Sequence, residues 1–282
     1  MTRADFSDSL RGLMQQSQFV RLLIAFATVG FWMALGWLLR LDANSYLLVG
    51  VPLLLIFQVV IARRPMTELW LKYQPIFRLS WWGVLVAGLF MIYPVISLFQ
   101  DWPGSTLPIR LWGIAAILGA IPLAFTLMNA NRMTWSFLLR CFLTAGIMGC
   151  SMMILVSVAK HHGFHLPRNA GRIAVGSFLL YLPICFVIEE VFFRGGLDSF
   201  IQKENDKNRW LTAIFLSSLW GWWHLPIVHT KDWPQFIVLV IAFPLIHCIP
   251  GIPFSLYWRK SGSLLVPAMV HAFIDSVRNA VM

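Results

Sequence analysis

Long apolar runs separated by short polar loops make up most of the chain. A membrane-spanning helix needs about 20 mostly apolar residues, and nine runs approach that length. The eighth is the shortest and carries Pro244, with two more prolines just beyond it, so it is predicted to be a broken or re-entrant helix. The pattern predicts an all-α, polytopic membrane protein with eight or nine transmembrane helices. The nine runs are Leu22–Leu39, Ser45–Ala62, Trp81–Phe99, Leu111–Met128, Phe137–Val158, Ile173–Phe193, Trp210–His224, Phe236–Cys248 and Leu264–Met282.

Composition excludes a soluble globule. Of the 282 residues, 59% are hydrophobic and 12% are charged, and the mean hydropathy is +0.72; soluble domains carry about 45–50% and about 25%. The formal charge of +10 could indicate a nucleic-acid binder, but the basic residues lie between the apolar runs and form no stripe. The lipid bilayer is therefore the expected partner, and nucleic acid is not.

Lysine and arginine collect in cytoplasmic loops of membrane proteins. With a cytoplasmic N-terminus, the inner loops hold ten of these residues and the outer loops six, so this orientation is favoured. The four cysteines lie inside apolar runs without CxxC spacing, which indicates neither a disulfide framework nor a thiolate metal site.

Ionisable residues inside the apolar runs concentrate in the second half of the chain. This asymmetry divides the chain into an N-terminal group of four transmembrane helices, residues 1–136, whose role the sequence does not reveal, and a polar-containing bundle, residues 137–282. Charged groups within a membrane mark functional sites. Residues 137–282 are therefore predicted to contain the functional site.

Two adjacent carboxylates and a guanidinium lie within the sixth apolar run. A charged group at a helix centre costs about 2.5–3.5 kcal/mol on insertion scales, so the three groups need partners. On one continuous helix Glu190 and Arg194 are spaced i, i+4 and can neutralise each other. Glu189 is turned about 100° away and stays free to act as a general base. By itself the cluster equally fits an ion pair that locks two helices.

Further polar side chains occupy later spans. His224 ends the seventh run, and His271 and Asp275 are spaced i, i+4 in the ninth. With a rise of 1.5 Å per residue, Glu189 lies roughly 24 Å from the outer face, and His224 and His271 lie roughly 21 Å and 10 Å from the inner face. These depths place the three side chains in one band, where we expect them to converge. His247, near the prolines of the eighth run, is interpreted as a packing residue, with the shared cavity as the alternative.

Three motifs together resemble the CPBP family of intramembrane proteases. They are Glu-Glu-x-x-x-Arg from Glu189, an aromatic-x-x-x-His ending at His224, and His-x-x-x-Asp from His271. That family includes the type II CAAX prenyl proteases and bacterial Abi-type proteins. The resemblance covers about residues 178–275 and implies a CPBP-like catalytic bundle in residues 137–282.

The resemblance implies a glutamate-dependent hydrolase. Glu189 would activate a water with the assistance of His224, and Glu190 and Arg194 would organise the site. No cofactor is implied. Two glutamates and two histidines could alternatively hold zinc, but no HExxH motif is present, so catalytic zinc is the less favoured reading.

His271 and Asp275 would help to stabilise the oxyanion, and here the chain departs from the family. Its aromatic position is usually Phe and is Trp220 here, and its last position is often Asn and is Asp275 here. An ionised aspartate cannot donate a hydrogen bond. Asp275 must therefore be protonated or must orient His271 instead.

The predicted activity is endoproteolysis of a membrane-delivered peptide or protein, in an integral membrane protein of the bacterial inner (plasma) membrane. The substrate could be a lipidated protein, a leader peptide or a bacteriocin-like peptide, and prenylated substrates are not expected in a bacterium. Two alternatives use the same polar cluster without proteolysis: a transporter, and an immunity protein that binds a toxin. A transporter predicts pseudo-symmetry between halves, which the unequal polar content disfavours.

Overall fold

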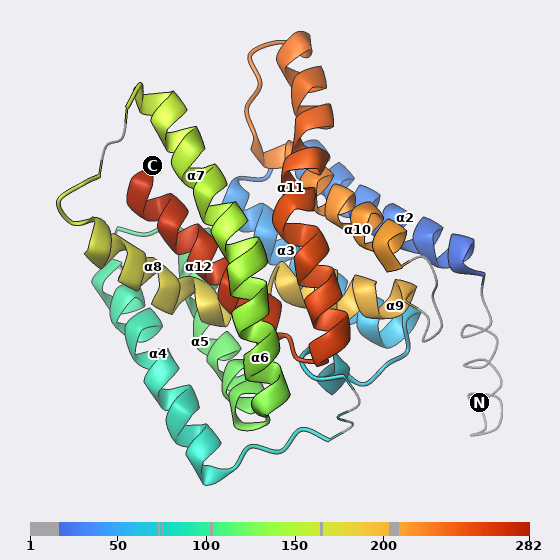
Figure 1. Ribbon diagram of the computed structural model, residues 1–282, viewed down its shortest axis with the longest axis vertical. Helices are drawn as coiled ribbons and strands as arrows, with labels where there is room; N and C mark the ends of the chain where they lie inside the picture. The colour runs from blue at the N-terminus through green and yellow to red at the C-terminus, as the bar shows by residue number, and fades with distance from the viewer. Residues whose placement is uncertain (1–16, 73, 75, 102–103, 164–165, 203–208) are drawn as a thin grey trace.

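The chain folds into a bundle of helices in the computed structural model (Figure 1). The structure describes residues 17–72, 74, 76–101, 104–163, 166–202 and 209–282. Two of the ten inner-loop residues counted in the orientation argument, Lys203 and Lys207, lie outside these ranges. Within those ranges the only extended pairing is an isolated bridge between Leu71 and Ser263. The predicted all-α polytopic class is confirmed.

Six helical stretches are long and apolar enough to cross a membrane. They comprise α2 (Gln18–Leu38); α3 (Ala43–Ile56) with the π-helix η1 (Phe57–Ile61); α4 (Trp81–Asp101); α5 (Leu107–Met128); α6 (Arg132–Cys141), η3 (Phe142–Gly146) and α7 (Ile147–His161) as one rod; and α11 (Trp233–Ser261).

The remaining helices are shorter and carry much of the polar content. They are the 3₁₀ turn η2 (Met66–Leu69), α8 (Ala170–Ile184), the π-helix η4 (Val191–Asp198), α9 (Ser199–Ile201), α10 (Arg209–Trp223), η5 (Leu225–Ile227) and α12 (Leu265–Val281). Three of the nine predicted spans therefore correspond to helices of 15, 15 and 17 residues, and the count of eight or nine stays a prediction.

The eighth span is not broken, contrary to the sequence prediction. α11 runs continuously for 29 residues through all three of its internal prolines, which at 1.5 Å per residue is about 44 Å. It begins at Asp232, whose carboxylate accepts from the Gln235 amide at 2.8 Å, and ends at Gly262 with φ 65°. Prolines are tolerated in spanning helices where neighbouring groups satisfy the freed carbonyls, so they did not mark a break.

The sixth span, by contrast, is interrupted. α8 ends at Ile184, directly after Pro183, and the chain turns before η4 begins at Val191. α5 can approach this break closely because it has Gly119 there; a Cβ at that position would lie 2.1 Å from the Pro183 carbonyl oxygen. The prediction that Glu189 and Glu190 share one continuous helix is therefore wrong.

An aromatic core joins the two predicted segments. Trp32 of α2 packs edge-on against Trp223 of α10, with ring centroids 4.9 Å apart, and against Phe192 of η4 at 4.8 Å. The hydroxyl of Tyr46 in α3 donates to the Trp223 carbonyl at 2.7 Å. Since one core spans both segments, the N-terminal helices support the helices that carry the polar residues.

Candidate active site

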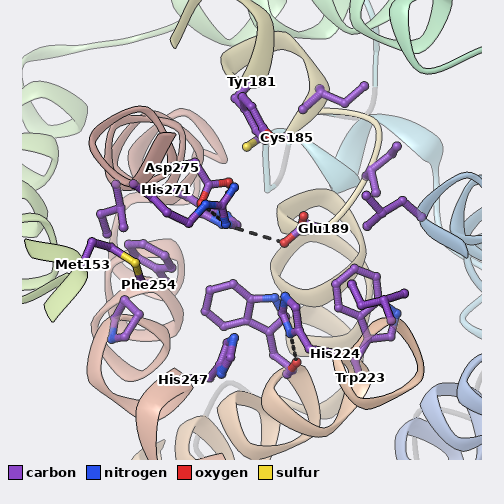
Figure 2. Close-up of a pocket in the computed structure, with 18 of the residues that line it drawn as sticks. Met153, Tyr181, Cys185, Glu189, Trp223, His224, His247, Phe254, His271 and Asp275 are labelled. Atoms are coloured by element: carbon purple, nitrogen blue, oxygen red, sulfur yellow. Dashed lines mark hydrogen bonds and ion pairs between the residues drawn. The ribbon is translucent and has the colours of Figure 1, made fainter. Parts of the chain in front are cut away.

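A cavity of about 240 Å³ lies among α3, α5, α7, α8, α10, α11 and α12. Four of the six predicted site residues line it: Glu189, His224, His271 and Asp275. Its volume is several times the about 30 Å³ that one water occupies in the liquid. The side chains predicted to converge come from separate segments of the chain and meet at this cavity, as Figure 2 shows.

Glu189 occupies the turn between α8 and η4 rather than a helix. Its φ is +47°, a left-handed conformation that costs a non-glycine residue roughly 1–2 kcal/mol. Its carboxylate faces His271 across the cavity (Figure 2), with Oε2 3.8 Å from the imidazole Nε2, and the side chain keeps 19% of its surface accessible. The turn thus presents an acceptor that a cavity water can reach.

Glu190 and Arg194 lie behind the cavity and do not line it. Both are 0% exposed, and the Arg194 Nε is 3.4 Å from the Glu190 Oε2. One guanidinium nitrogen also donates to the Ser255 hydroxyl at 3.2 Å. The predicted i, i+4 pairing is confirmed, because both residues belong to the helical turn that begins after Glu189.

His271 links the buried pair to the cavity. Its Nδ1 bonds the Glu190 Oε1 at 3.1 Å, and its Nε2 lies 3.8 Å from Glu189 and 3.6 Å from Asp275. Asp275 in turn pairs with Arg278, whose Nη1 is 2.9 Å from Oδ1. This Asp275 oxygen accepts from a charged hydrogen-bond donor. This contact supports the orienting alternative for Asp275.

His224 and His247 lie in contact in the cavity wall, with ring centroids 4.4 Å apart and the ring planes tilted by 33°. Each Nδ1 lies 2.8 Å from the backbone carbonyl four residues earlier, at Trp220 and Phe243. Since a carbonyl only accepts, both Nδ1 atoms carry the proton, and both Nε2 atoms remain for other partners. His247 lines the same cavity as His224, so the interpretation as a packing residue alone was incomplete.

Several cavity residues were not predicted from the sequence. Asn44 of α3, Trp112 of α5 and Met153 of α7 line it from outside the motifs, and no local pattern marks them. Arg278 also lines the cavity. The sequence spacing could have predicted its position, because a cation three residues after Asp275 lies on the same helical face.

The residues around the cavity do not form an evident metal site. Among the described residues, no group of three or more His, Cys, Asp or Glu side chains is arranged to hold a metal ion. The Nδ1 of His271 is hydrogen-bonded to Glu190, and the Nδ1 of His224 is hydrogen-bonded to a backbone carbonyl. A metal-free reaction stays a prediction that a chelator can test.

Comparison with known proteins gives one match. Residues 171–277 match the model of the Rce1-like family, type II CAAX prenyl endopeptidases. All six predicted site residues fall inside the matched range, and the match confirms the resemblance to the CPBP proteases. Together with the apolar helices it indicates a membrane protein in which residues 171–277 are similar to type II CAAX prenyl endopeptidases. No curated protein and no solved structure matches the chain.

Proposed function

We propose that this chain is an intramembrane glutamate-dependent endopeptidase, building on the protease domain in residues 171–277. The observation that carries the proposal is the shared cavity: Glu189, His224 and His271, from three separate elements, all line it. A carboxylate and two imidazoles around one hydrated space are the groups that peptide hydrolysis requires as base, proton donor and charge stabiliser.

In the proposed reaction a water lies between Glu189 and His224. Glu189 accepts one proton as the water oxygen attacks the scissile carbonyl carbon, and the carbonyl oxygen becomes an oxyanion. The proton then passes from Glu189 to the leaving amine as the carbon–nitrogen bond breaks, which yields a carboxylic acid and an amine. The acid then releases the second proton of the water to the solvent and becomes a carboxylate. Glu190 and Arg194 act from behind the cavity, because Glu190 fixes the Nδ1 of His271 and leaves Nε2 directed at the reacting groups.

Asp275 acts by orienting His271 rather than by donating to the oxyanion. The reason is its bond to Arg278 at 2.9 Å, in which the Asp275 carboxylate is already engaged as an acceptor from a charged donor. His271 then supplies the positive hydrogen-bond donor near the oxyanion through Nε2. This assignment replaces the amide donor that the related proteases often have at this position.

The proposed substrate is a membrane-delivered peptide or protein. Apolar side chains from three helices outside the motifs, among them Trp112, Met153 and Ile246, form much of the cavity wall, and Ile246 is 37% exposed. An extended peptide segment with apolar side chains fits such a lining. The proposed location is a bacterial inner membrane with the N-terminus in the cytoplasm.

Asp275→Asn is expected to lower kcat about tenfold, which corresponds to about 1.4 kcal/mol. The asparagine amide keeps the shape of the Asp275 side chain but loses the negative charge that pairs with Arg278 and orients His271. The measurement is kcat and KM for a cleaved reporter peptide in purified, detergent-solubilised protein. Arg278→Gln removes the same ion pair from its other side and should give a similar fall. An Asp275→Asn variant faster than the wild type would instead show that this position donates to the oxyanion.

Chelation is expected to leave cleavage unchanged within about twofold, because the cavity offers no three-ligand donor set among the described residues. The test incubates purified protein with 1,10-phenanthroline and follows reporter cleavage. Loss of activity that zinc restores would overturn the metal-free proposal and revive the zinc alternative.

A further inference from the structure

The short segment 66–72 contacts both parts of the chain that carry the proposed catalytic groups. It lies in the loop between η1 and α4, outside the range that matches the protease family. Nothing in its sequence pattern marks it as functional. Its role therefore has to be argued from its contacts.

The first contact is with the turn that holds Glu189. The indole Nε1 of Trp70 donates to the backbone carbonyl of Phe186 at 2.8 Å. Phe186 lies between the end of α8 and Glu189, where a helix end leaves carbonyls without backbone donors. An indole N–H is a donor only, and here it satisfies one of those carbonyls from a segment 116 residues away.

The second contact is with the turn that starts α12. The Lys72 amide donates to the Gly262 carbonyl at 2.8 Å, and the Leu264 amide donates to the Trp70 carbonyl at 2.9 Å. α12 begins at Leu265 and carries His271 and Asp275. Trp70 therefore bonds, through its side chain, the turn that holds Glu189 and, through its backbone, the turn before α12, the helix that carries His271.

Close packing holds the segment in place. A Cβ on Gly195 of η4 would lie 2.3 Å from the Leu69 carbonyl oxygen, so the two backbones touch. The Lys72 ammonium lies 5.0 Å from the centroid of the Trp258 ring, and burial lowers the pKa of Lys72 to about 8. The segment is thus part of the packed interior and not a loose connection.

The bond to Phe186 matters because the turn is strained. Glu189 has a left-handed backbone without being glycine, and such a conformation persists only where the surroundings fix it. Within the turn, the Val187 and Ile188 amides both donate to the Ile184 carbonyl, at 2.9 and 2.8 Å. The bond from Trp70 adds an anchor from outside the turn.

We propose that Trp70 is a positioning residue for Glu189, acting through the Phe186 carbonyl, and that segment 66–72 ties the Glu189 turn to the start of α12. The catalytic part of this inference rests on the proposed protease function. The conformational part does not, because it concerns the turn itself.

The test is Trp70→Phe, which keeps an aromatic ring and removes the N–H. We expect kcat to fall about tenfold with KM within about twofold of the wild type. Backbone hydrogen exchange in the peptide covering residues 185–191 should become at least about fivefold faster. Trp222→Phe is the matched control, because it removes an indole bond of the same 2.8 Å length to the Val240 carbonyl, and it should leave both measurements unchanged.

Wild-type kcat and unchanged exchange in Trp70→Phe would overturn the inference. So would faster exchange spread evenly over the whole protein, which indicates general destabilisation. Gly195→Ala provides a second test if Trp70→Phe does not fold, because the added Cβ displaces segment 66–72 from η4; it should speed exchange in the same peptide, and an unchanged rate would refute the tie. Failure of the protease proposal looks different: the wild type would cleave no reporter peptide, or Glu189→Gln would keep full activity, whatever the exchange rates show.

Discussion

Replacing Glu189 with Gln is expected to abolish peptide cleavage, with kcat reduced by about 10³-fold or more, or about 4 kcal/mol. The amide has nearly the same shape but cannot accept the proton of the attacking water. Because the side chain is partly accessible in a cavity wall, the substitution leaves no buried unpaired charge and folding should persist. The measurement is reporter cleavage by purified protein, with thermal unfolding recorded in parallel.

Asp232→Asn is the matched control for that experiment. It makes the same carboxylate-to-amide change at the exposed N-cap of α11, where asparagine caps about as well, and activity should stay at the wild-type level. A fully active Glu189→Gln variant would remove the proposed base. Wild-type protein that cleaves no membrane-delivered peptide, but binds one or moves an ion, would instead favour an immunity protein or a transporter.

Replacing Arg194 with Leu is expected to destabilise the fold by about 3–5 kcal/mol, because removing one partner leaves a buried charge uncompensated. Arg194 and Glu190 are both 0% exposed, and neither is among the residues that line the cavity. The loss should appear as a large fall in the unfolding midpoint of the purified protein and in the amount that accumulates in membranes.

A double variant separates this charge effect from lost packing. Glu190→Gln combined with Arg194→Leu removes both charges and should recover a substantial part of the stability lost in the single variant. Arg132→Leu is the control, since Arg132 is an exposed cation at the N-terminus of α6, where a positive charge contributes little. If Arg194→Leu has the same unfolding midpoint as the wild type, the buried ion pair does not stabilise η4.

The roles of the individual residues could be inferred only in part from their spacing. Glu190 and Arg194 were correctly paired because i, i+4 neighbours meet on any helical turn. Glu189 was predicted to lie on a continuous helix and lies in a turn instead. The apolar run continues through the α8–η4 turn, so hydropathy does not reveal a turn that tertiary contacts stabilise. Pro183 was the one local hint.

The sequence by itself determined that this is a helical membrane protein with a protease-like polar cluster, because apolar run length and intramembrane charge are local properties of a chain in lipid. Only the tertiary structure decided how the cluster is held: the left-handed turn at Glu189, the ring contact between His247 and His224, and the bond from Trp70 to Phe186. Each depends on backbone and side-chain groups far apart in sequence satisfying one another inside an interior where water cannot.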